Sequence, residues 1–73
     1  MADAAHAGGL GTIASVEAQT AIGKYNAKVD DALFIVGNGT ASTPSNAFIV
    51  KNDGTVIAKG KELTADTIID NTI

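Results

Sequence analysis

The chain has 73 residues, the size of one small domain. Hydrophobic residues make up 45% of it, but only 4% are aromatic and a large part of the remainder is alanine. There is no cysteine, which excludes disulfides and thiolate metal sites. A small domain with few large apolar side chains and no covalent cross-link is expected to gain its stability by association.

The charge balance and the apolar runs exclude further classes. The net charge is −3, and the basic residues are all lysines, which argues against a nucleic-acid partner because such partners select a basic, Arg-rich face. The longest apolar run, 32–36, is far shorter than the roughly 20 residues of a membrane helix. Residues 1–6 lack the basic and apolar regions of a signal peptide, so any export information is expected elsewhere.

The first segment, 4–29, is rich in small residues that recur at a spacing of fourteen positions. The identical pairs are Ala4 and Ala18, Ala7 and Ala21, and Gly9 and Gly23. An Ala-rich helix is one reading, but each glycine costs a helix about 1 kcal/mol relative to alanine. We therefore predict a solenoid over 4–29, in which two short strands and tight turns form one coil of about fourteen residues. Gly23 is expected at a turn.

The middle segment, 30–60, has the pattern of three strands. Residues 32–36, 46–51 and 55–59 are rich in β-branched and aromatic residues and are separated by turn sequences. We predict a hairpin between the second and third strands because Asp-Gly supplies the positive φ angles of a tight turn. The predicted turn residues of this segment are Gly37, Asn38, Gly39, Asp53 and Gly54.

Alternation along these strands leaves both sides apolar, whereas a half-solvated sheet shows polar residues on one side. A chain this short has no helix to cover the second side, so another copy of the chain is the expected cover. The predicted core and subunit interface consists of Ile22, Leu33, Phe34, Ile35, Val36, Phe48, Ile49, Val50 and Val56. For the tail, 61–73, helical spacing of isoleucines and a strand-favouring Thr-Ile-Ile run leave helix and strand both open.

Three stretches resemble a known family. His6–Ser15 resembles the repeat of the left-handed parallel β-roll, Gln19–Asn26 its final coil, and Ile35–Val56 the closing β-segment that follows. This roll builds the YadA-like head of trimeric autotransporter adhesins and occurs in phage tail fibres. The resemblance covers about Ala5 to Gly60. It implies an all-β fold: a short β-roll followed by a hairpin or β-prism-like segment, in an intertwined homotrimer with a structural or adhesive role.

The chain also departs from the family pattern. Gly8 stands where the repeat usually has Glu, and Pro44 where an Arg commonly precedes Ser-Asn-Ala-Phe. Val16 stands where the repeat usually has Gly at a turn, so that corner is expected to be wider than usual. About one and a half coils are present, which implies a truncated roll.

No group of residues predicts catalysis, a metal site or a cofactor. His6 has no positioned carboxylate or nucleophile beside it in the sequence. Asp30 and Asp31 are adjacent and are expected to point apart in a solvated loop. The stretch 52–54 lacks the acidic ladder of a calcium loop, and 37–40 lacks the lysine and helix of a phosphate loop. Asn38-Gly39-Thr40 matches a glycosylation acceptor, which matters only in a eukaryotic secretory pathway.

We therefore expect a non-enzymatic trimeric fibre or adhesin head module, extracellular, on a phage particle or a bacterial surface. Its expected partners are its own copies, flanking fibre domains, and a host receptor or glycan contacted through the loop 40–45. The alternative is a monomeric or dimeric binding domain that uses a strand edge for β-augmentation. A hydrolase is disfavoured because the paired acid and base it needs would have to come from Glu17, Glu62 and scattered aspartates.

Overall fold

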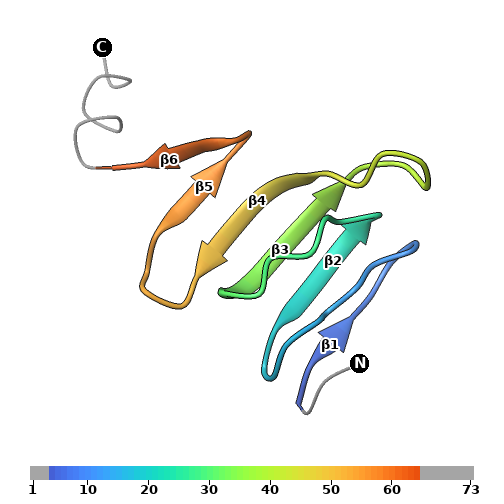
Figure 1. The fold of residues 1–73 in the computed structure, drawn as a ribbon, viewed down its shortest axis with the longest axis horizontal. Helices are drawn as coiled ribbons and strands as arrows, with labels where there is room; N and C mark the ends of the chain where they lie inside the picture. Colours follow the sequence, from blue (N-terminus) through green and yellow to red (C-terminus); the bar gives the residue numbers. More distant parts are fainter. Residues whose placement is uncertain (1–3, 65–73) are drawn as a thin grey trace.

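The computed structural model describes residues 4–64, and this part of the chain is all-β, with no helix. Six strands form one mixed sheet in chain order (Figure 1). The strands are β1 (His6–Ala7), β2 (Thr20–Lys24), β3 (Ala32–Asn38), β4 (Asn46–Lys51), β5 (Val56–Ala58) and β6 (Lys61–Leu63). The all-β prediction is confirmed, and the helical reading of the first segment is wrong.

The first three strands are parallel and repeat with a register of fourteen residues. His6 pairs with Thr20, and Thr20 pairs with Phe34. The same step relates Leu10 to Lys24 in an isolated parallel bridge. The spacing seen in the sequence is thus the length of chain between stacked strands. The prediction of two strands in each coil is wrong, because residues 11–19 and 25–31 form no strand.

The last four strands are antiparallel. β3 pairs with β4, β4 with β5, and β5 with β6. The β4–β5 turn closes when Gly54 N–H donates to the Lys51 carbonyl at 3.0 Å, with Gly54 at φ 90°. The β5–β6 turn places Lys59 and Gly60 at φ 53° and 77°. Residues 61–63, the first of the predicted tail, form β6. Residues 65–73, for which the sequence leaves helix and strand both open, lie outside the described residues.

The sheet has two unlike faces. We call the inner face the side that carries Ala7, Ala21, Ile35, Ile49 and Ile57, which follow one another in register across β1 to β5. The outer face carries two registered rows on the other side of the same strands. These rows are Thr20, Phe34, Val50, Val56 and Leu63, and Ile22, Val36, Phe48, Ala58 and Lys61.

The buried core lies on the inner face. The segments that join β1 to β2 and β2 to β3 cross this face (Figure 1) and bring Ala14 and Val29 against Ala21 and Ile35. Ala21 and Ile35 are fully buried, and Ile35 is the largest buried apolar side chain of the described part. Small alanines allow the crossing segments to approach the sheet closely, which is why so few large side chains are buried.

Several residues expected at turns lie elsewhere. Gly23 is inside β2, and Gly37 and Asn38 are inside β3, so β3 is two residues longer than predicted. These glycines mark close backbone approach instead of chain reversal. A Cβ on Gly23 would overlap the Gly37 carbonyl oxygen. Gly39, also expected at a turn, follows β3 directly.

The corner between β1 and β2 is also built differently from the expectation for Val16. Val16 is not among the residues with positive φ; Ala18, two positions on, is the residue with φ 63°. Gln19 N–H donates to the Val16 carbonyl at 3.2 Å and closes the corner. The corner therefore holds a β-branched residue without left-handed strain at Val16 itself.

Candidate interaction surface

Two asparagines join successive layers of the chain in the same way. Asn26 is 2% exposed; its Oδ1 accepts from the Ile13 N–H at 2.7 Å and its Nδ2 donates to the Ile13 carbonyl at 2.9 Å. Asn46 binds Ala27 by the same pair of bonds, at 2.8 and 3.0 Å. Ile13 and Ala27 are fourteen positions apart, so each amide replaces a strand partner at an equivalent place in the coil.

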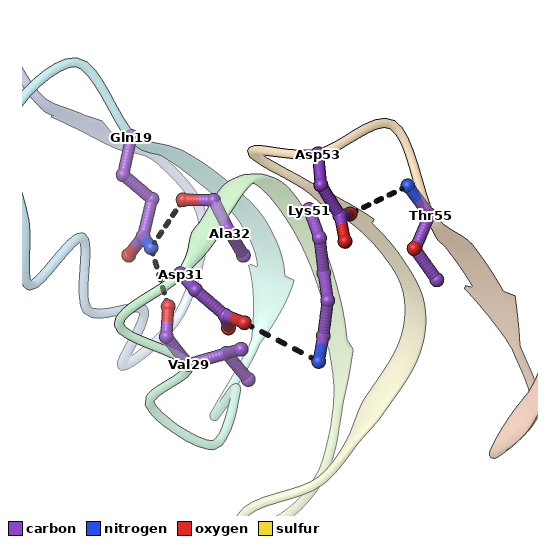
Figure 2. Close-up of polar contacts among 7 residues, drawn as sticks. All are labelled: Gln19, Val29, Asp31, Ala32, Lys51, Asp53 and Thr55. Atoms are coloured by element: carbon purple, nitrogen blue, oxygen red, sulfur yellow. Dashed lines mark hydrogen bonds and ion pairs between the residues drawn. The ribbon is translucent and has the colours of Figure 1, made fainter.

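Gln19 makes the matching bridge at the other corner (Figure 2). Its Oε1 accepts from Ser15 N–H at 2.9 Å, and its Nε2 donates to the carbonyls of Val29 and Ala32, each at 2.8 Å. Gln19 is fully buried. Because all its polar atoms have partners, burial of this amide stabilises one arrangement of the corner.

The adjacent aspartates have separate partners, as pairs on an extended segment do. Asp30 Oδ1 accepts from the Ser15 hydroxyl at 3.2 Å. Asp31 Oδ2 lies 3.4 Å from Lys51 Nζ (Figure 2), which ties the coil corner to the end of β4. Within residues 4–64 no three His, Cys, Asp or Glu side chains gather where they could hold a metal ion.

The other polar positions singled out in the sequence lie in short exposed strand ends or in the loop after β3. His6 is exposed, and its imidazole Nε2 lies over Gly8, 3.2 Å from where a Cβ on that residue would stand. In the loop after β3, Thr40 and Thr43 exchange backbone hydrogen bonds at 3.0 and 3.1 Å. Asn38 of the glycosylation sequence is exposed.

Asp53 lies in the β4–β5 turn together with Gly54. Its carboxylate accepts from the Thr55 N–H at 2.9 Å (Figure 2). This backbone hydrogen bond, followed by one from the Thr55 side chain, lowers the pKa of Asp53 below its ordinary value of 3.8. The group is fully exposed, so its role is local: it fixes the turn.

The structure separates the nine predicted core and interface residues into three groups. Six lie in the outer-face rows: Ile22, Phe34, Val36, Phe48, Val50 and Val56. Ile35 and Ile49 lie on the inner face, in or against the core. Leu33 stands at an irregularity in the β3–β4 pairing and is 44% exposed. None of the six belongs to the core cluster of the described residues.

Charge is distributed unevenly between the two sides of the molecule. Among the ten residues of the outer-face rows, Lys61, on the edge strand β6, is the charged one. The segments that cross the inner face carry the exposed residues Glu17, Lys28, Asp30 and Asp31. The two outer-face rows are therefore apolar apart from Thr20 and Lys61, and an apolar surface rimmed by polar residues is typical of a contact site.

Sequence reasoning missed the bridging amides Gln19, Asn26 and Asn46. Their positions gave no signal: Gln19 precedes β2, Asn26 follows β2, and Asn46 is the first residue of β4, and any ordinary polar residue can stand at such places. No helix in residues 4–64 is long and apolar enough to cross a membrane. No family model matches the chain, and no curated protein or solved structure matches it either.

Proposed function

We propose that the chain is a non-enzymatic homotrimeric fibre module: a truncated left-handed β-roll followed by a closing β-segment that intertwines with its copies. One observation carries this proposal. In the described part, the buried hydrophobic side chains are Ala14, Ala21, Ala32 and Ile35. A core of three alanines and one isoleucine is too small to hold a domain of this size, so the half-exposed apolar side chains need a cover.

The parallel strands with their fourteen-residue register support the roll. A coil that adds one strand per fourteen residues places equivalent side chains above one another, which is the arrangement of a solenoid. The resemblance of His6–Ser15 and Ile35–Val56 to the adhesin head supports the threefold assembly. The radius of gyration, 12.8 Å, exceeds the roughly 11 Å of a compact domain of this length, as expected for a part of a larger assembly.

In this role the module is extracellular, in a phage tail fibre or a bacterial surface adhesin, and its neighbours are flanking fibre domains. Three copies present three equal loops 40–45, and weak contacts of each loop with a host receptor or glycan would add through avidity. Four residues of this loop, 41–44, are exposed together with Thr40, and none is charged.

The alternative, a monomeric or dimeric domain that binds a strand at its edge, is weakened by β6. This edge strand is three residues long and carries Lys61 and Glu62, with Glu62 next to Ile57 on the inner face, and the other edge strand, β1, is two residues long. Short edges and inward-pointing charges are devices that discourage edge pairing.

Sedimentation equilibrium of the full chain tests the proposal. A mass three times 7.3 kDa, without dissociation at micromolar concentration, is the expected result. A compact single subunit that melts cooperatively at that concentration would refute the trimer and favour the edge-binding alternative.

A further inference from the structure

The two faces of the sheet differ in what covers them. The inner face has its own cover, because the crossing segments bury Ala21 and Ile35 completely. On the outer face, Ile22 remains 37% exposed and Leu63 also 37%, although both stand in rows of apolar neighbours. The chain therefore covers the inner side of its sheet over β1 to β3, with Ile49 and Ile57 of β4 and β5 partly buried, and leaves the outer side apolar and open.

We infer that the outer face, centred on Phe34, Val36 and Phe48, is the surface through which copies of this chain pack on one another, and that the crossing segments face solvent. This inference deepens the proposed function and rests on it. It assigns Ile35 and Ile49 to the fold of each copy and removes them from the subunit interface.

The area of the outer face is consistent with other copies of the chain as its cover. Six strands spaced about 4.8 Å apart and contributing some 13 Å each make a flat area of roughly 400 Å², before side-chain relief is added. A specific interface buries about 800 Å² per partner. One outer face thus supplies about half of the area that a partner buries in a standard interface, so it must contact more than one copy to reach that area, as it would in a core shared by three copies.

The chemistry of the outer face also favours a second copy of the chain as its partner. The ten residues hold no acidic group, and the single cation, Lys61, stands at the edge of the sheet where it can stay solvated. A nucleic acid or an anionic lipid surface would need cations at the centre. A surface that is apolar at its centre is best matched by an equally apolar surface, and the outer face of a second copy is one.

Thiol protection in the full chain tests the inference, because the native sequence contains no cysteine. The variants are Ile22→Cys, on the outer face, and Ile13→Cys, on a crossing segment. The two side chains are matched, since they are 37% and 42% exposed in the single chain. A single chain therefore predicts similar rates of maleimide labelling for the two, whereas packing through the outer face predicts labelling of Ile22→Cys to be slower by about tenfold or more, with equal rates in denaturant.

Sedimentation of both variants separates the two levels of the argument. An assembly with the Ile22→Cys thiol protected and the Ile13→Cys thiol reactive supports the inference. An assembly in which the two thiols react equally, or in which only the Ile13→Cys thiol is protected, overturns it and leaves the trimer standing. If the unsubstituted chain is a monomer, both the proposed function and this inference fail.

Discussion

The ring of Phe48 meets the ring of Phe34 edge-on, with centroids 6.1 Å apart and ring planes at 74°. The two residues lie on neighbouring strands of the outer face, and their contact is the one aromatic pair among the described residues. An edge-to-face pair of this kind contributes about 0.5–1.5 kcal/mol beyond the area it buries.

Phe34→Asp or Phe48→Asp is expected to dissociate the assembly and unfold the chain together. A carboxylate placed in a shared apolar core without a partner costs several kcal/mol. Light scattering and circular dichroism, read on the same sample, measure the two effects. Phe48→Leu is the matched control and should remain assembled. A folded monomer of either Asp variant would contradict the idea that the copies share a core.

Asn26→Leu is expected to destabilise the coil by about 2–4 kcal/mol, because the N–H and the carbonyl of Ile13 both lose their partner, the buried Asn26 amide. For a domain of this length that corresponds to a fall in Tm of roughly 10–25 °C. Thermal melting followed by circular dichroism measures it. Asn38→Ala changes an exposed asparagine of β3 and should melt within a few degrees of the parent. Equal Tm values for the two variants would show that the bridge adds nothing.

Gly23→Ala and Gly54→Ala separate backbone strain from steric overlap. Both glycines have φ 90°. At Gly54 a Cβ would meet no atom within 4 Å, so strain alone applies, at about 1–2 kcal/mol. At Gly23 the Cβ would also overlap the neighbouring strand, and the loss is expected to exceed that of Gly54→Ala by about 2 kcal/mol or more. Urea unfolding gives both values; similar midpoints would argue against the close approach of β2 and β3.

Asp53 predicts a small acid-sensitive part of the stability. Its pKa is lower in the folded chain than the ordinary value of 3.8, so its contribution is present above that value and is lost as the pH falls through the folded pKa. The urea midpoint of the parent should therefore fall more between pH 5 and pH 2.5 than that of Asp53→Asn. The difference between the two midpoints should be small, because the carboxylate is fully exposed. A steeper fall in the Asn variant would reverse the assigned sign.

The strands of the second half could be predicted because side-chain chemistry defined them. The apolar runs around Phe34 and Phe48 and the Asp53-Gly54 turn are local signals, and the structure has strands and a turn there. The fourteen-residue spacing could also be predicted, because identical alanines and glycines recur where equivalent positions of successive coils leave room only for a small residue. Which side of each strand is covered was not readable, because both sides are apolar in the sequence.

What the sequence could not supply are contacts made across long separations. Gly37 resembles a turn residue in the sequence, yet it lies in β3. A Cβ added there would stand 2.6 Å from the Lys24 carbonyl oxygen and 2.7 Å from the Asn26 Cβ, so this strand position requires a glycine. Asn26 and Gln19 read as polar loop residues, and only the folded chain brings them to backbone groups that have no other partner. The interface residues stay a prediction, because the structure describes a single chain.

The register between His6, Thr20 and Phe34 links the height of the parallel part of the sheet to the number of fourteen-residue units in the chain. Each unit of fourteen residues raises the stack by one strand spacing, about 4.8 Å, and leaves the junction with the antiparallel strands unchanged. Duplicating or deleting whole units would then lengthen or shorten the stack of parallel strands while each amide bridge keeps its partner in the neighbouring unit. An insertion of one residue within a strand would instead turn buried alanines such as Ala21 toward solvent.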